Sequence, residues 1–184
     1  MGAAFGSNRG DDRSHGVDIV RRLEEADAPE MWRLRREALE REPASFGEAV
    51  EEHLKSTPAA SAERLASGGS ESFVYGAFDG RELVAMAGFY REKRIKRRHK
   101  GVIWGVYVAP AHRGRGLARA VMTSLLDSAR ALPGLKCIYL SVTAEQPGAR
   151  NLYTSLGFRS FGLEPRALAV NGQYLDEEHM LLQL

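Results

Sequence analysis

The chain has 184 residues, and its 26 Lys and Arg nearly balance its 24 Asp and Glu, which gives a formal net charge of +2. This balance excludes a protein with an extended polyanion-binding tail, although it allows a local basic patch. The length and a hydrophobic content of 43% fit one soluble globular domain. Cys137 is the single cysteine, so no internal disulfide can form, and no apolar run is long enough to span a bilayer. We therefore expect a cytoplasmic protein without a membrane segment.

The first residues differ from the rest in composition. Residues 1–16 are rich in glycine and contain almost no large apolar side chain besides Phe5, so they cannot bury enough surface to offset the entropy of ordering. We predict a disordered tail or an expression remnant over residues 1–16 and one folded domain over residues 17–184.

The N-terminal part of this domain has the pattern of a strand followed by helices. Residues 17–23 form a β-branched run, and residues 27–42 place apolar side chains at helical spacing behind early acids. Two further segments, 46–55 and 61–69, extend the helical region until the Gly68–Gly69 pair ends it.

Three strands are predicted next. The apolar runs 72–78 and 82–92 are separated by Asp79–Gly80, a dipeptide suited to a tight hairpin turn. Residues 101–109 are too apolar to have a solvated face, which predicts a central strand.

Beyond this strand, helices and strands alternate. Apolar side chains at helical spacing predict a helix over 114–132, and a shorter helix is expected over 146–156. Strands are expected over 137–143, 158–162 and 174–184.

The most informative segment is the turn between the central strand and the following helix. Such a turn points unpaired backbone N–H groups outward at the positive end of a helix, which forms an anion site. Gly114 and Gly116 allow a ligand to approach the backbone, while Arg113 and Arg115 add charge suited to phosphate oxygens. A plain strand-to-helix turn with solvated arginines is the alternative interpretation.

Two nucleotide-binding motifs do not fit this turn. A dinucleotide fingerprint needs a third glycine where Arg119 stands and an acid after the next strand, which is missing. A phosphate-binding P-loop needs Lys and then Ser or Thr, but Leu117 and Ala118 occupy those positions.

The turn instead resembles that of the GNAT superfamily of acetyl-coenzyme A-dependent N-acetyltransferases. Arg113, Gly116 and Ala118 match its signature, and Val108 and Pro110 stand at the expected places in the preceding strand. A second block is also similar to the family pattern: Leu140, Val142, Ala149, Leu152, Tyr153, Gly157 and Phe158. Across residues 17–184 the resemblance implies the GNAT fold, an α+β, three-layer-like arrangement in which helices flank a mixed, mostly antiparallel sheet of about six to seven strands.

The resemblance also implies the activity and the cosubstrate. Acetyl-CoA would place its pyrophosphate on the turn and its pantetheine along the strand ending at Val108, and a primary amine of a small molecule, peptide or protein would attack the thioester directly. Gln146 stands where many members carry Asn, which is a departure from the pattern. The cofactor-binding residues implied in this way are Val106, Val108, Arg113, Gly114, Arg115, Gly116, Leu117, Ala118, Gln146, Asn151 and Tyr153.

Two catalytic groups are implied. The backbone N–H of Val108 would receive the thioester oxygen as it gains charge. Tyr153 would protonate the departing thiolate, unless it is a core residue whose hydroxyl only caps a backbone group. The strand over 101–109 has no carboxylate, so the general base is left open between Glu145, Glu71 and a held water.

Other chemistry has less support. Cys137 starts an apolar strand, where a thiol is usually an inert hydrophobe rather than a nucleophile. The five histidines and one cysteine show no metal-ligand spacing, so we expect no metal.

The basic segment over residues 91–100 holds seven cations and one acid, Glu92, which raises the alternative of a nucleic-acid-associated module. No aromatic side chain for base stacking lies within it, so a solvated hairpin tip is favoured. A family member that binds coenzyme A without turnover is a further alternative.

The acceptor is not identified by the sequence. The resemblance implies that residues 25–70 recognise it, and it is also compatible with a homodimer through strand edges. On the last strand Tyr174, Asp176 and Glu178 would share one face, either in an acceptor pocket or, as we favour, on a solvated edge.

Overall fold

The computed structural model describes residues 19–184, so the tail predicted over residues 1–16 and the start of the first predicted strand lie outside the described residues. Seven strands form one mixed sheet in the order β1-β2-β3-β4-β5-β7-β6. Its pairs are antiparallel except for the parallel pair of β4 and β5, which confirms the predicted sheet. The strands are β1 (Ile19–Arg22), β2 (Ser72–Asp79), β3 (Glu82–Arg91), β4 (Lys100–Val108), β5 (Cys137–Thr143), β6 (Arg159–Val170) and β7 (Gln173–Gln183).

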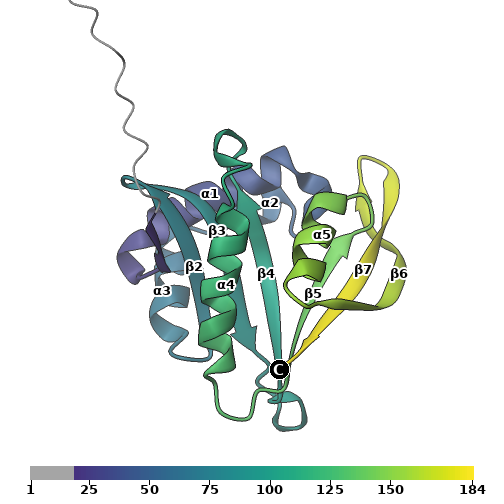
Figure 1. Ribbon diagram of the computed structural model, residues 1–184. Coiled ribbons are helices and arrows are strands. Elements are labelled where there is room, and N and C mark those ends of the chain that lie inside the picture. The colour runs from purple at the N-terminus through teal and green to yellow at the C-terminus, as the bar shows by residue number, and fades with distance from the viewer. Residues whose placement is uncertain (1–18) are drawn as a thin grey trace, which may run out of the picture.

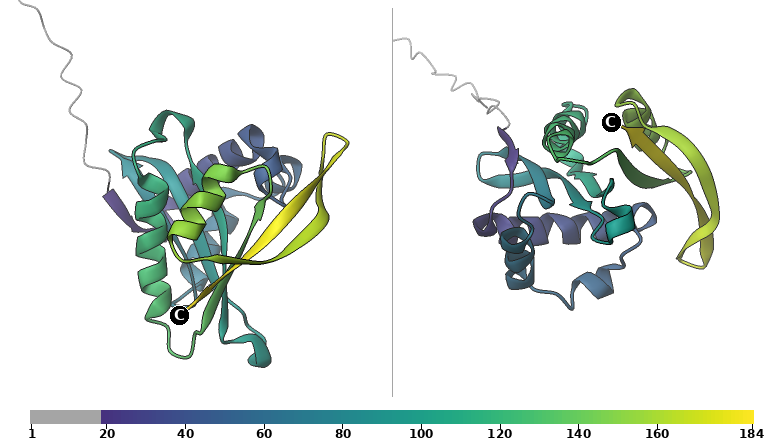
Figure 2. Two further views of the ribbon diagram at one scale, coloured as in Figure 1. Left: turned by 45° about the vertical axis from the view of Figure 1, so that its right-hand side comes forward. Right: turned by 90° about the horizontal axis from the view of Figure 1, so that it is seen from below.

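Helices cover both faces of this sheet (Figures 1 and 2). One face carries α4 (Leu117–Arg130) and α5 (Pro147–Ser155). The opposite face carries α1 (Ala28–Arg41), α2 (Val50–His53) and α3 (Pro58–Ser67). Within the described part of the chain, no helix is long and apolar enough to cross a membrane.

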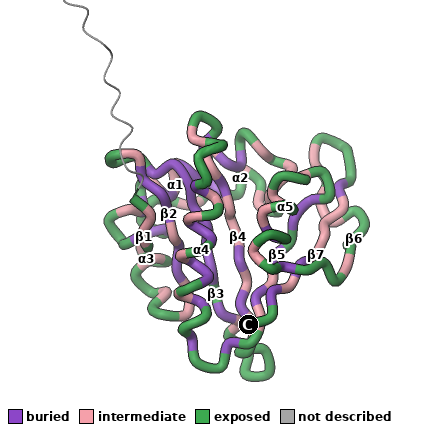
Figure 3. The backbone as a smooth tube through the Cα atoms, in the orientation of Figure 1, coloured by how far each residue is buried: buried purple, intermediate pink, exposed green. Residues whose placement is uncertain are grey.

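The core forms where α4 and α1 pack on the middle of the sheet. Strand β3 is buried along most of its length, whereas β6 is mainly exposed (Figure 3). The apolar stripe of α4, including Val121, Met122 and Leu125, is almost completely buried, as expected for an amphipathic helix against a sheet. From the other face, Leu34 of α1 is fully buried.

Several predicted elements differ in extent from the observed ones. The helical segments predicted over 46–55 and 61–69 have other bounds: α2 covers only Val50–His53, and α3 begins earlier, at Pro58, where the hydroxyl of Thr57 caps the helix by accepting a hydrogen bond from the N–H of Ala60 (3.3 Å). The strand predicted over 158–162 continues to Val170. It tolerates Pro165 because β6 is an edge strand whose pairing with β7 is irregular between Glu164 and Leu168.

The central strands β4 and β5 part from one another. Their pairing runs only from Lys100 opposite Cys137 to Val102 opposite Tyr139, while β4 continues to Val108. The pairing of β4 with β3 also shifts by one residue near Gly105, whose φ is +63°. This bulge and the opening beside it create room in the middle of the sheet.

Candidate active site

The glycine turn leads directly into the N-terminus of α4. Gly114 and Gly116 have φ values of +76° and +78°, and a Cβ added to either would have no neighbour within 4 Å. Gly116 is the N-cap of a 14-residue helix and provides no side-chain cap. The first N–H groups of α4 therefore face open space at the positive end of the helix, which suits an anion.

The backbone of Val108 points toward the opening between β4 and β5. The N–H of Ala109 donates to the carbonyl of Val84 on β3 (2.8 Å), so this is a hydrogen-bonded pair. In an antiparallel ladder the next pair, Val108 opposite Ala85, is not hydrogen-bonded. The N–H of Val108 thus faces away from β3, on the side where pairing with β5 has ended.

A cavity of about 800 Å³, here the turn cavity, lies between the glycine turn, β4 and α5. Most of the predicted cofactor residues line it: Val106, Val108, Arg113, Gly114, Gly116, Leu117, Ala118, Gln146 and Tyr153. Arg115 and Asn151 are not on its wall. Arg115 lies 3.6 Å from a carboxylate oxygen of Asp79, and Asn151 is exposed on α5.

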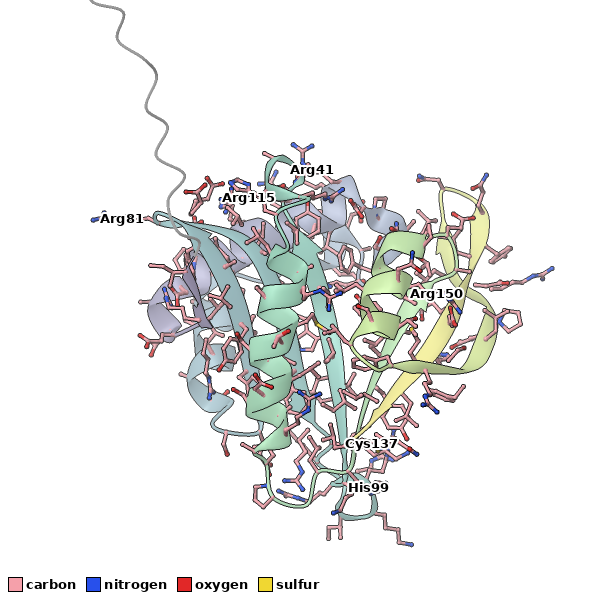
Figure 4. All side chains as sticks on the ribbon, viewed as in Figure 1. Arg41, Arg81, His99, Arg115, Cys137 and Arg150 are labelled. Atoms are coloured by element: carbon pink, nitrogen blue, oxygen red, sulfur yellow. The ribbon has the colours of Figure 1, made fainter. Side chains whose placement is uncertain are left out.

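Arg41 and Arg119 also line the turn cavity and were not predicted. Arg41 ends α1, far away in the sequence, and Figure 4 shows it at the same end of the molecule as Arg115. Arg119 stands in the first turn of α4 and donates to the hydroxyl of Ser155 on α5 (2.7 Å). Arg119 could have been predicted from the sequence, because it stands three residues after Gly116 at the start of the helix. Arg41 could not, because only the fold brings the end of α1 to the turn cavity.

Arg113 is held against the protein rather than extended into solvent. Its Nε donates to the carbonyl of Val108 (3.1 Å), and its Nη2 donates to the carboxylate of Glu42. The guanidinium also lies 5.8 Å from the ring centroid of Tyr107. Arg113 therefore ties the glycine turn to β4 and to the end of α1, and Glu42 offsets its charge.

Tyr153 is buried in α5 with its side chain on the wall of the turn cavity. Burial raises the pKa of its phenol above the usual value, so the hydroxyl stays protonated at neutral pH. No residue of the described chain accepts or donates a hydrogen bond at this hydroxyl, so it does not cap a backbone group there.

A second cavity of about 320 Å³, here the aromatic cavity, adjoins the first. On β4, the residues from Val106 onward line the turn cavity, whereas the residues up to Gly105 line the aromatic cavity. In the segment before α2, Ala44 lines the turn cavity and the next residue, Ser45, lines the aromatic cavity. Gln146 bridges this junction, because its Nε2 donates to the hydroxyl of Ser45 (3.0 Å). The aromatic cavity is lined by Arg35, Ser45, Phe46, Gly47, Tyr90, Val102, Ile103, Trp104, Gly105, Tyr139, Leu140, Ser141, Phe161, Glu177 and His179.

The face of β7 that lines the aromatic cavity is not the one considered from the sequence. Glu178 accepts from Arg150 of α5 (2.6 Å), and Asp176 accepts from the N–H of Arg166 (2.8 Å), so both acids are used within the protein. Glu177 and His179 face the cavity instead. Of the two alternatives for the face of Tyr174, Asp176 and Glu178, the acceptor pocket is therefore not supported, because the parting of β4 and β5 leaves the other side of β7 beside the cavity.

The other candidates for general base or nucleophile lie elsewhere. Glu71 accepts hydrogen bonds from Arg91 (3.1 Å) and Arg98 (2.5 Å). Cys137 lies beside His99 at the end of the sheet opposite the turn (Figure 4). Glu145 is exposed and lines neither cavity.

A mixed sheet that opens between two central strands, with a glycine turn at a helix N-terminus beside the opening, is the α+β architecture of the GNAT fold. The chain belongs to the acetyltransferase (GNAT) family, whose model matches residues 28–158.

Comparison with known proteins agrees with this assignment. N-alpha-acetyltransferase RimI of Mycobacterium tuberculosis is 36% identical over 115 residues, which are 62% of this chain and 68% of that protein. Spermidine N(1)-acetyltransferase of Vibrio cholerae is 33% identical over 84 residues, 46% of this chain and only 49% of that relative. A GNAT acetyltransferase structure from Streptococcus pneumoniae has the same fold, with a TM-score of 0.83 at 19% identity over 91% of this chain and 100% of that one.

Proposed function

We propose that this protein transfers the acetyl group of acetyl-CoA to a primary amine of a small molecule, peptide or protein. The observation that carries the proposal is that two cavities adjoin each other where β4 and β5 part. One cavity ends at an anion-binding turn and the other is lined by aromatic side chains, so two different ligands can meet at the junction.

The residues around the turn cavity suit acetyl-CoA, which would supply the acetyl group as an activated thioester. The N–H groups at the start of α4 and the cations of Arg41 and Arg119 suit a pyrophosphate. The open backbone edge of β4 beyond Val102 offers donors and acceptors to an extended amide chain. A volume of about 800 Å³ is within the usual range for cofactor sites.

Two groups of this chain would act on the reacting atoms. The N–H of Val108 faces the opening and would stabilise negative charge on a carbonyl oxygen there. The hydroxyl of Tyr153 is protonated, lacks a partner in the described chain and lies on the same cavity, so it would donate a proton to the leaving sulfur.

The proposal is tested by incubating the protein with acetyl-CoA and a panel of amines and detecting acetylated products by mass spectrometry. Transfer to at least one amine class, and none without the amine, is the expected result. Acetyl-CoA binding without transfer to any amine would instead favour a non-catalytic family member.

The basic segment over residues 91–100 gives little support to a nucleic-acid-binding function. Arg91 and Arg98 pair with Glu71, and Arg97 pairs with Glu92 at 2.8 Å, so three of its seven cations are held by carboxylates of the protein. A polyanion groove needs cations free to replace counterions.

A cytoplasmic location and a homodimer belong to the same proposal. The lone cysteine suits a reducing compartment. Leu163 of edge strand β6 and Tyr174 of β7 are more than half exposed, which suits a contact between two copies. Light scattering of the wild type and of Leu163→Lys tests the dimer, which the lysine should dissociate.

A further inference from the structure

The carboxylate of Glu177 has an unusual position in the aromatic cavity. It is the only carboxylate on the wall of that cavity, and within residues 19–184 it forms no ion pair or hydrogen bond. Of the basic groups on the wall, Arg35 lies 2.9 Å from Glu48 through Nη2, while its buried Nη1 has no hydrogen-bond partner in the described chain, and the Nε2 of His179 lies 2.9 Å from Glu164. One negative charge of the wall is therefore available to a ligand.

Glu177 lies near the junction with the turn cavity. In the sheet it is opposite Thr143 of β5, whose carbonyl accepts a hydrogen bond from the N–H of Gln146 (3.0 Å). The side chain of Gln146 in turn reaches Ser45, which marks the junction. A cation held by Glu177 would therefore lie at the end of the aromatic cavity next to the turn cavity.

The remaining walls hold aromatic side chains and one guanidinium and, among the described residues, no second acid. Tyr90, Trp104, Tyr139 and Phe161 line the cavity, and the rings of Tyr139 and Phe161 are 5.7 Å apart in an edge-to-face arrangement. The guanidinium of Arg35 lies between Phe46 and Trp104, at 4.6 Å and 6.0 Å from their ring centroids. A second ammonium group would meet this positive charge and find no further acid on the wall.

We propose that Glu177 binds the ammonium group of the acceptor and that the acceptor is a monoamine with an aromatic or large apolar body. This inference rests on the proposed acetyltransferase function. It excludes a polyamine as the preferred acceptor, although one relative is named for acting on spermidine.

The test uses the full chain with 2-phenylethylamine and spermidine as probes, in titration calorimetry and in steady-state acetylation. The wild type should bind and acetylate 2-phenylethylamine with kcat/KM about 10-fold or more above that for spermidine, because a further ammonium group of spermidine would be desolvated without an acidic partner, which costs about that factor or more. Glu177→Gln should weaken 2-phenylethylamine binding and raise its KM about 10-fold, with the KM for acetyl-CoA unchanged.

Glu178→Gln is the matched control, since it makes the same chemical change on the opposite face of β7 and should leave both KM values unchanged. Thermal melting checks that the variants are folded. Unchanged 2-phenylethylamine binding in Glu177→Gln, absence of binding in the wild type, or a preference for spermidine would overturn the inference. Glu177-dependent binding without acetylation would support the site and reject only the proposed function.

Discussion

Tyr153 combines three properties at one position: it is buried, its hydroxyl has no partner in the described chain, and its side chain lines the turn cavity. A buried phenol normally finds a hydrogen-bond partner, because leaving it unpaired costs free energy. A buried hydroxyl that lines a cavity and has no protein partner is expected to form its hydrogen bond with a ligand.

Removing this hydroxyl should therefore affect turnover and not binding. Tyr153→Phe is expected to lower kcat by about 100-fold or more, as is typical for the loss of a general acid. The dissociation constant of acetyl-CoA, measured by calorimetry, should change less than about twofold. Equal loss of turnover and affinity would show that Tyr153 only shapes the cavity.

The raised pKa of Tyr153 also predicts how kcat depends on pH. Burial disfavours the phenolate, so the protonated and active form persists above the usual pKa near 10. The kcat of the wild type should consequently show no falling limb below about pH 10. A fall between pH 8 and 9 would assign the proton to another group.

Gly116 tests the assignment of the turn. Gly116→Val places a side chain where the ligand would approach and forces a φ of +78°, so acetyl-CoA binding should be lost. Gly172→Val is the control, because its φ of +77° imposes similar strain in the β6–β7 hairpin, away from both cavities. Loss of binding in both variants would indicate general destabilisation rather than a blocked site.

At the scale of elements, the pairing of β3 with β4 shapes the aromatic cavity. Gly88 of β3 is opposite Trp104 of β4, and a Cβ at position 88 would lie 2.1 Å from the indole ring. The absence of a side chain at Gly88 thus allows the indole to lie across the strand.

Gly88→Ala should displace Trp104 and so change the aromatic cavity but not the turn cavity. We expect a higher KM for the amine, an unchanged affinity for acetyl-CoA, and a loss of about 1–3 kcal/mol in the free energy of unfolding from overpacking. Chemical denaturation and steady-state kinetics measure these effects. A weaker affinity for acetyl-CoA would show that a change in the aromatic cavity also alters the turn cavity.

Glu71 joins the end of β3 to the basic segment. The side chain of Arg91 is 9% exposed and relies on Glu71, so Glu71→Gln should lower the free energy of unfolding by about 1–3 kcal/mol. Its kcat should equal that of the wild type, since Glu71 is not on either cavity. A large fall in kcat would restore Glu71 as a candidate base.

Most elements of this fold follow from local patterns, whereas the site depends on relations between distant strands. The Asp79–Gly80 hairpin and the apolar stripe of α4 are visible in the sequence because turn chemistry and helical spacing are local. Nothing local indicates that β4 and β5 pair over only three positions, and so the cavity face of Glu177 could not be predicted. Arg41 was missed for the same reason.

At the scale of the whole molecule, ligand binding should stabilise the fold measurably. A ligand at 100 times its dissociation constant adds about 2.7 kcal/mol, which corresponds to a Tm increase of roughly 5–10 °C in a domain of this size. Thermal melts with and without acetyl-CoA provide the measurement. Gly116→Val should show no such increase, and an equal increase in that variant would place the ligand elsewhere.

The short pairing of β4 with β5 also has a consequence for internal motion. Strands β1–β4 and strands β5–β7 are two smaller sheets joined by only three residue pairs, and α4 packs on the first while α5 lies over the second. The amide protons of Val106 and Val108 should exchange with deuterium faster than those of β3, since local stability varies across a structure. A ligand in contact with both halves would slow this exchange and link the two sheets into one cooperative unit.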